Sequence, residues 1–302
     1  MKVMAGFGLG VCSHTGLVRG SNEDDYLLGC LPAPATGPLL CAIADGMGGA
    51  AGGAEASRTA LRALGMAVLD GASKAPLEQR LRDGFAAASM RVFDAAAAVP
   101  ALNDMGTTLT ALCFQDGVAR LGHVGDTRVY RLRDGTWEQL TKDHAVREPD
   151  NLLTRCIGGG HPSCEVDHAE FSTRAGDRFV LVTDGVWGVV PAVALGKLVE
   201  RGEPQAVAEA LVAQALTLGG PDNATAVVVD VLAKPAEASS RDVELPRDER
   251  PGDRNLWPRA VSLRSPVWPW LVLAGALLLL LQAGLRWGFG VDGLRWVLDQ
   301  VR

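Results

Sequence analysis

Acidic side chains occur at strand ends or in glycine turns at four places along the chain. These places are Asn22-Glu23-Asp24, Asp45-Gly46-Met47-Gly48-Gly49, Thr183-Asp184-Gly185 and Pro221-Asp222-Asn223. Carboxylates and backbone carbonyls, without histidine or cysteine partners, are the ligands that hard cations such as Mg²⁺ or Mn²⁺ prefer, and they argue against zinc. A single Asp-Gly pair is more typical of a turn than of a ligand, so only the four features together indicate a metal site.

The composition restricts the partners that such a site can serve. The chain has 302 residues, of which 48% are hydrophobic, so it can bury one sizeable core and still carry an appendage. Its formal net charge is −6, with acidic and basic residues mixed along the chain, so no basic face indicates nucleic-acid binding. Small or phosphorylated partners fit this composition better.

The cysteines and the N-terminus both bear on the compartment. No C-x-x-C pair is present, and we expect buried free thiols in a reducing compartment. The six cysteines are Cys12, Cys30, Cys41, Cys113, Cys156 and Cys164. The apolar run at the N-terminus is short and interrupted by glycines, so it predicts a first strand and not a secretory signal peptide.

Residues 1–233 alternate strand-like and helix-like segments, as expected for one globular domain. Apolar, β-branched or alternating runs predict strands at 39–44, 107–114, 118–124, 128–132, 178–183 and 224–231. Alanine-rich amphipathic stretches predict helices at 53–69, 77–97 and 204–218. The short turns at 115–117 and 133–135 predict antiparallel hairpins, so the expected fold class is α+β.

The C-terminal part of the chain differs in character. Residues 234–266 are rich in Pro, Asp, Glu, Arg and Ser and show no period, which predicts a disordered linker. Residues 267–285 are uncharged over a length that can cross a bilayer, with Trp268, Trp270 and Trp287 at the ends, which predicts a transmembrane helix. A buried core helix is the alternative. Residues 286–302 form a short tail that follows.

Six segments of the chain, taken in order, resemble those of a known family. They are Ser13-His-Thr-Gly-Leu-Val-Arg-Gly-Ser-Asn-Glu-Asp24, Ala44-Asp-Gly-Met-Gly-Gly49, Met105-Gly-Thr-Thr108, Gly122-His-Val-Gly-Asp-Thr-Arg128, Thr183-Asp-Gly185 and Asp222-Asn223. Together they resemble the type-2C, metal-dependent (PPM) protein-serine/threonine phosphatases of bacterial type, over nearly all of residues 10–232. The resemblance implies a four-layer αββα sandwich, with two antiparallel sheets face to face, helices outside, and metals in a cleft between the sheets.

The resemblance also implies a role for each matched carboxylate. Asp45 would bridge two metal ions, Mn²⁺ or Mg²⁺. The Gly46 carbonyl and Glu23 would bind one ion, and Asp184 and Asp222 the other. Asp24 would support the site through bound water.

Two further matched residues carry an implied role. Arg19 corresponds to the family's phosphate clamp, for which a planar guanidinium suits two phosphoryl oxygens. A surface arginine with no such role is the alternative. Asp126 corresponds to an aspartate that binds a third, weaker metal in bacterial members, and a turn-forming role is its alternative. The implied reaction is direct hydrolysis of a phosphoester by a water that the two metals activate.

The chain departs from the family pattern at several positions. Met47 stands where animal members have a histidine proposed to protonate the leaving group, so the general acid is unassigned. His123 and His144 lie in matched segments, although a lone histidine is more often structural. His14 replaces a more usual aspartate. The stretch 142–158 is much shorter than in typical bacterial relatives, which implies that a helical flap beside the cleft is largely missing.

The leading hypothesis is a phosphoserine/phosphothreonine phosphatase that acts on phosphorylated proteins and opposes a serine/threonine kinase. One alternative is a catalytically weak, membrane-anchored binding or scaffold module on the same fold. Another is a phosphatase of a partner-switching transcription regulator. The arginines on either side of 267–285 mildly favour a single-pass protein of the bacterial inner membrane with its catalytic domain in the cytoplasm.

Overall fold

The computed structural model describes residues 2–4, 6–31, 37–48, 50–146 and 152–232. The chain divides into two compact units, Met1–Leu245 and Pro246–Arg302, and every described residue belongs to the first. The linker, the transmembrane helix and the tail predicted at 234–302 lie outside the described residues. Among the described helices, none combines the length and the apolar character needed to cross a bilayer.

The first sheet contains six antiparallel strands and joins the two ends of the domain. Its strand order is β1 (Lys2–Met4), β2 (Phe7–His14), β15 (Ala224–Val231), β14 (Arg178–Val182), β8 (Arg128–Arg133) and β9 (Thr136–Gln139). β15 pairs with β2 over eight positions, from Phe7 opposite Val231 to His14 opposite Ala224. This register brings the loop after His14 beside the residues that precede Ala224.

The second sheet is built around β4 (Leu39–Met47). The strand order is β12 (Ile157–Gly158), β5 (Gly106–Thr107), β4, β6 (Leu109–Gln115), β7 (Val118–Val124) and β13 (Asp167–Ser172), and β3 (Asp24–Cys30) pairs with β4 as well. A separate short pair consists of β10 (Ala145–Val146) and β11 (Leu152–Leu153).

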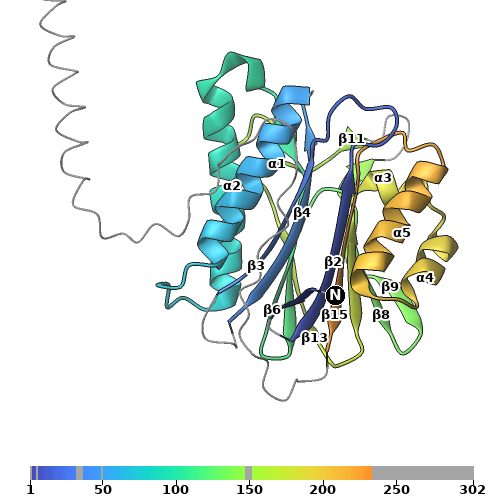
Figure 1. The fold of residues 1–302 in the computed structure, drawn as a ribbon. Helices are drawn as coiled ribbons and strands as arrows, with labels where there is room; N and C mark the ends of the chain where they lie inside the picture. Colours follow the sequence, from blue (N-terminus) through green and yellow to red (C-terminus); the bar gives the residue numbers. More distant parts are fainter. Residues whose placement is uncertain (1, 5, 32–36, 49, 147–151, 233–302) are drawn as a thin grey trace, which may run out of the picture. The chain divides into compact units, whose positions relative to one another are not determined.

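Helices cover the outer face of each sheet (Figure 1). α1 (Ala50–Val68) and α2 (Leu77–Ala98) pack on the second sheet, and a 3-10 turn at Pro100–Leu102 follows them. α3 (Asp184–Trp187), α4 (Ala192–Val199) and α5 (Pro204–Thr217) pack on the first sheet. The result is the expected order of helices, sheet, sheet and helices.

Strand β4 shows why its sequence is apolar without interruption. Alternate side chains of a strand point to opposite faces, and both faces of β4 are buried. Its side chains in the core under α1 and α2 are Leu40, Ala42 and Ala44. Those in the core between the two sheets are Leu39, Cys41 and Ile43.

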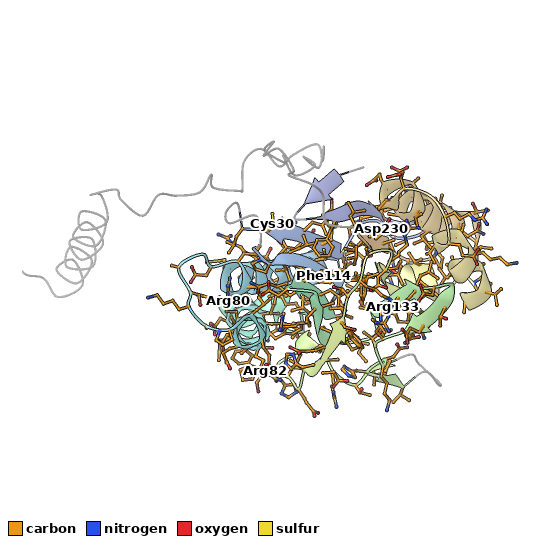
Figure 2. The ribbon with its side chains drawn as sticks, turned by 90° about the horizontal axis from the view of Figure 1, so that it is seen from below. Cys30, Arg80, Arg82, Phe114, Arg133 and Asp230 are labelled. Atoms are coloured by element: carbon orange, nitrogen blue, oxygen red, sulfur yellow. The ribbon has the colours of Figure 1, made fainter. Side chains whose placement is uncertain are left out.

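Aromatic side chains fill the space between the sheets. The ring centroid of Phe114 on the second sheet lies 5.2 Å from that of Phe179 and 5.0 Å from that of Phe7, both on the first sheet. Figure 2 shows Phe114 among the side chains between the two sheets. Each such aromatic pair adds about 1 kcal/mol beyond the burial of its area.

Both predicted hairpins form. Asp116 and Gly117 have φ angles of 52° and 76°, and Asp134 and Gly135 have 50° and 76°. Two consecutive left-handed residues match the right-handed twist of the flanking strands, and Asp-Gly is a preferred pair for them. The turns join β6 to β7 and β8 to β9.

The predicted strands and helices are present, with two kinds of difference. The strand predicted at 107–114 is interrupted at Thr108, because Gly106–Thr107 pairs with the end of β4 and with β12 while Leu109 onward pairs with β7. The sequence patterns did not predict β3, β9, β13 or α4, since their side chains are only partly buried. They also did not predict β10, β11, β12 or α3, which have only two to four residues each. The cysteines are free, but only Cys41 and Cys113 are fully buried, which corrects the expectation for the other four.

Candidate metal centre

A cavity of about 400 Å³ collects most of the predicted site residues. Its lining carries five carboxylates and a single arginine among the described residues. The residues that line it are Arg19, Glu23, Asp45, Gly46, Met47, Gly48, Thr108, Asp126, Leu152, Leu153, Asp184, Asp222 and Asn223. Asp24, alone among the predicted ligands, does not line the cavity. The cavity receives residues from both sheets, so it forms only when the sandwich is assembled.

Asp45 lies at the end of β4, and its backbone is held on both sides by the neighbouring Thr108. The N–H of Asp45 donates to Thr108 Oγ1 (2.9 Å), and the Asp45 carbonyl accepts from the N–H of Thr108 (2.9 Å). Burial and then the charges of Asp24 and Asp184 raise the pKa of Asp45 well above its usual range. Its carboxylate is therefore costly to ionise without a cation.

Gly46 places its backbone where a side chain has no room. A Cβ at this position would lie 2.1 Å from the carbonyl oxygen of Gly53 in α1. The Gly46 N–H donates to the carbonyl of Glu23 (3.2 Å), so the end of β4 is bonded to the residue that precedes β3. Only glycine permits this close approach, which keeps the Gly46 backbone at the cavity wall.

Glu23 is anchored through its backbone. Its N–H donates to Asn223 Oδ1 (2.8 Å), and its carbonyl accepts from Ser57 Oγ (2.7 Å). The Glu23 side chain lines the cavity, and burial raises its pKa. The backbone is thus fixed by two distant segments while the carboxylate faces the cavity.

Asp24 lies behind the cavity, opposite Asp45 in the β3–β4 register. One carboxylate oxygen, Oδ2, accepts from Thr183 Oγ1 (2.9 Å) and from Thr225 Oγ1 (2.7 Å). The other, Oδ1, is buried without a hydrogen-bond partner. Burial raises the pKa of Asp24 to about 7. An unpartnered buried oxygen beside the cavity is suited to a water or an ion.

Asp184 and Asp222 come from the first sheet. Asp184 is the first residue of α3 and follows Thr183, the residue after β14, and Asp222 lies just before β15. Burial and the nearby charge of Asp222 raise the pKa of Asp184. The Oδ1 atom of Asp222 accepts from the N–H of Asn223 (2.8 Å).

Arg19 lies at the mouth of the cavity, with about half of its side chain exposed. Its Nη2 donates to Asp222 Oδ2 (2.7 Å), so the predicted clamp is paired with a predicted metal ligand. This contact is an exposed ion pair, which is weak and easily exchanged. The guanidinium can therefore exchange Asp222 for another anion at low cost.

Asp126 lines the same cavity from the loop between β7 and β8, and its residue is 4% exposed. Its backbone carbonyl accepts from Trp187 Nε1 (3.1 Å), on the helix that begins with Asp184. The loop of Asp126 is thereby linked to the element that carries a predicted metal ligand.

The two histidines in matched segments do not line the cavity. His123 bonds Thr110 Oγ1 (2.9 Å) and the Lys142 carbonyl (3.1 Å), and burial lowers its pKa to about 4. His144 packs on it with ring centroids 4.8 Å apart. These contacts agree with the structural interpretation of both residues. His14 lies outside the lining as well, with its Nδ1 accepting from the N–H of Gly16 (2.9 Å).

The stretch 142–158 reaches the cavity without a helical flap in its described part. Residues 142–146 and 152–158 contain only the short strands β10, β11 and β12. Leu152 and Leu153 line the cavity, and Leu152 is 68% exposed. An apolar wall therefore stands beside the acidic floor.

Sequence reasoning did not predict the residues that hold the ligands in place. The Asn223 side-chain amide donates to the carbonyls of Thr15 and Ser21 (2.8 Å each) while accepting from Glu23, so it closes the loop between β2 and β3. Thr108 fixes Asp45 in a comparable way. Both lie in matched segments, but no local pattern distinguishes an amide that reaches across 200 residues from a turn residue.

The side chains as they stand are not grouped as a finished coordination shell. Within the described ranges, no three His, Cys, Asp or Glu side chains are arranged to hold a metal ion. Five carboxylates nevertheless line one cavity, and one of them, Asp222, is engaged by Arg19.

Comparison with known proteins places these features in a family. The Protein phosphatase 2C family model matches residues 14–231. The serine/threonine protein phosphatase PstP of Mycobacterium tuberculosis is 36% identical over 242 residues, which are 73% of this chain and 44% of that protein. The chain therefore spans less than half the length of this relative.

Solved structures agree with this match. The catalytic domain of PstP in complex with two manganese ions superposes with a TM-score of 0.68 at 34% identity, over 75% of this chain and 99% of that one. PppA, a component of the type VI secretion system of Pseudomonas aeruginosa, superposes with a TM-score of 0.66 at 34% identity, over 75% and 98%. With a family match over most of its described residues, the chain belongs to the protein phosphatase 2C family.

Proposed function

We propose that the chain hydrolyses phosphoserine and phosphothreonine in proteins, using divalent cations held in the acidic cavity. The observation that carries this proposal is the convergence of five carboxylates and Arg19 on one cavity from both sheets. Relatives of this family that are named serine/threonine phosphatases support it.

The donor set fits Mn²⁺ or Mg²⁺. All candidate ligands are oxygens, which hard cations prefer. Asp45 and Asp184 are close enough for a side-chain hydrogen bond, although both carry raised pKa values. Two buried carboxyl groups in contact need either a shared proton or a cation between them. Asp24 Oδ1, buried and unpartnered, adds a further acceptor behind them.

Asp45, the Gly46 carbonyl, Glu23, Asp184 and Asp222 would hold two cations, and Asp24 would act through bound water. When bound, two such cations would polarise the phosphoryl group and lower the pKa of the attacking water. A PstP structure that contains two manganese ions supports this number. Asp126 would hold a third, weaker cation on the α3 side of the cavity.

The remaining steps belong to side chains of the chain itself. Arg19 releases Asp222 and binds two phosphoryl oxygens, which positions the phosphorus over the carboxylates and offsets negative charge. Leu152 and Leu153 exclude water from the flank of the substrate. Among the described residues, no histidine lines the cavity, so water in place of an imidazole would protonate the leaving alkoxide.

Hydrolysis of p-nitrophenyl phosphate by the full chain in Mn²⁺ tests the activity directly. Wild type should turn over, and Asp184→Asn should not, because the amide removes one charge from the ligand set without changing its shape. A matched control is Asp94→Asn, which removes an exposed carboxylate of α2 outside the cavity lining. If wild type and Asp184→Asn hydrolyse the ester equally, the phosphatase proposal fails.

The cellular role follows from the same chemistry. The chain would reverse the action of a bacterial serine/threonine kinase on phosphorylated proteins. Phosphoserine and phosphothreonine sites should gain occupancy when the gene is deleted and lose it when the wild-type chain is restored. Restoring the Asp184→Asn chain should leave them phosphorylated. Unchanged occupancy in the deletion would remove the kinase-opposing role.

A membrane anchor is the last part of the proposal. Residues 267–285 would span the bacterial inner membrane once, with the catalytic domain in the cytoplasm and 234–266 as linker. Cell fractionation of the full chain and of a chain ending at Ser265 tests this. The full chain should sediment with membranes and the shorter one should not. Equal distribution of the two would overturn the anchor.

A further inference from the structure

His144 is bonded to the loop that carries Asp126, although its side chain does not line the cavity. The N–H of His144 donates to the Gly125 carbonyl (2.8 Å), and the N–H of Gly125 donates to His144 Nδ1 (3.2 Å). Gly125 has a φ of +108°, which only glycine adopts without strain. Backbone and imidazole together thus hold the residue directly before Asp126.

The opposite side of His144 is bonded to the apolar wall of the cavity. Its carbonyl accepts from the N–H of Thr154 (2.8 Å), and Ala145 pairs with Leu153 in the β10–β11 ladder. Leu153 and its neighbour Leu152 both line the cavity. The wall and the Asp126 loop therefore meet at one residue.

The imidazole itself is fixed in one tautomer by its surroundings. Because Nδ1 accepts an amide proton, Nε2 carries the hydrogen and donates to Asp167 Oδ2 (3.1 Å). Arg155 Nη1 lies 3.2 Å from the same Nε2 and donates to Asp167 Oδ1 (2.8 Å), so the arginine and the imidazole share one carboxylate. His144 is 6% exposed, and its ring packs against the His123 ring. A ring held at both nitrogens and on one face cannot turn away from Gly125.

We propose that His144 is a positioning residue that couples the Leu152–Leu153 wall to the Asp126 loop. Through this coupling, Leu152 and Leu153 keep a fixed position relative to the Asp126 carboxylate. The proposal rests on the proposed function for its catalytic consequence. The mechanical coupling follows from the bonds alone.

The coupling predicts that the Nδ1 contact sets the affinity for Mn²⁺ at the Asp126 side. Without it, Gly125 loses a bond, and Asp126 can shift relative to the other carboxylates. Losing a residue that orients a metal ligand typically costs about tenfold or more in metal affinity. The backbone bonds of His144 to Gly125 and Thr154 survive any substitution, so the fold around it should persist.

The test compares three substitutions at one position. His144→Ala removes both ring nitrogens. In His144→Asn, the amide oxygen lies near the place of Nδ1 and can accept from Gly125. In His144→Gln, the amide reaches instead toward the place of Nε2 and Asp167. His168→Ala is the matched control, since His168 is a half-buried imidazole that packs against Phe85 and not against the cavity.

Mn²⁺ binding by calorimetry and amide hydrogen exchange are the readouts that need no turnover. His144→Ala and His144→Gln should weaken the weakest Mn²⁺ site about tenfold and deprotect the Gly125 amide, whereas His144→Asn should restore both. In hydrolysis assays, the half-saturating Mn²⁺ concentration should rise while kcat at saturating Mn²⁺ is largely retained. The His168→Ala chain should bind Mn²⁺ as wild type does.

Equal Mn²⁺ affinity in the Asn and Gln chains would overturn the proposal, and so would wild-type affinity in the Ala chain. If the Ala chain fails to fold, the Asn–Gln comparison still decides. Absence of hydrolysis by wild type would refute the proposed function and leave the calorimetric and exchange comparison intact, so the two failures are distinguishable.

Discussion

The domain handles buried charge in opposite ways in two regions. Arg178 and Asp230 face each other across β14 and β15, with two N–H···O contacts of 2.6 and 2.7 Å. The same guanidinium also donates to the carbonyls of Val199 and Gly202. In the cavity, by contrast, carboxylates gather around a single arginine, and behind it Asp24 Oδ1 has no hydrogen-bond partner.

The difference separates a structural charge from a functional one. Burying an ion costs several kcal/mol unless hydrogen bonds and an opposite charge offset the loss of water. The Arg178–Asp230 pair is satisfied by the protein alone. The cavity is not, and the raised pKa values of Asp45 and Asp184 reflect that deficit. A cation can contribute most to stability where the fold leaves buried carboxylates without an opposite charge.

The largest expected effect follows from removing a carboxylate charge from the cavity. Asp45→Asn should lower kcat/KM for p-nitrophenyl phosphate about 10³-fold, because several kcal/mol of charge stabilisation are lost with the cations. In EDTA the same variant should unfold at a higher temperature than wild type, since an unfavourable buried charge has gone. Loss of both activity and metal-free stability would contradict the comparison.

The second prediction concerns the Arg178–Asp230 pair, where we expect a loss of stability without a loss of activity. Arg178→Met should lower the free energy of unfolding by about 3 kcal/mol, because Asp230 is left without its partner in a mostly buried place. The Mn²⁺-dependent kcat/KM should not change. Urea denaturation followed by circular dichroism measures the loss. Arg82→Met, which breaks the exposed pair with Glu78, is the control and should cost less than about 1 kcal/mol.

The buried imidazole of His123 extends the comparison, because burial favours its neutral form. The pKa of His123 is lowered from 6.5 to about 4, so the unfolded chain binds more protons between these values. Its contribution to stability is present above pH 6.5 and is lost as the pH falls toward 4. About 2 kcal/mol should go between pH 7 and pH 5.

Urea denaturation of wild type and His123→Gln at pH 7 and pH 5 tests this contribution. Glutamine can still donate to the Lys142 carbonyl but does not titrate. The His123→Gln chain should therefore lose less free energy of unfolding between pH 7 and pH 5 than wild type. The cavity carboxylates, with raised pKa values, act with the opposite sign in both chains, and the difference between chains removes them. Parallel losses in the two chains would contradict the assignment.

The smallest effect concerns the exposed ion pair at the cavity mouth. Arg19→Lys keeps the charge but loses bidentate geometry, so KM should rise about tenfold while stability stays within about 1 kcal/mol. Steady-state kinetics with thermal unfolding separates the two quantities. A drop in stability without a change in KM would make Arg19 a structural residue.

Much of the fold could be predicted from local patterns. The uninterrupted apolar run of β4 and the Asp-Gly turns identify their elements because burial and left-handed φ angles select residue types directly. Strands β9 and β13 were missed, since their partly buried side chains lack a clear alternation. The candidate ligands were recognised as a set through their motifs, and each was found at the cavity except Asp24, which lies behind it.

The sequence by itself determined the residue types of the site, the family and the elements that carry them. Only the tertiary structure decided what those residues contact. Arg19 meets Asp222 across 203 positions because β2 and β15 pair in one register, and Asn223 reaches Glu23 for the same reason. Local patterns record burial and turn geometry, whereas long-range contacts depend on how strands align, and no single segment contains that information.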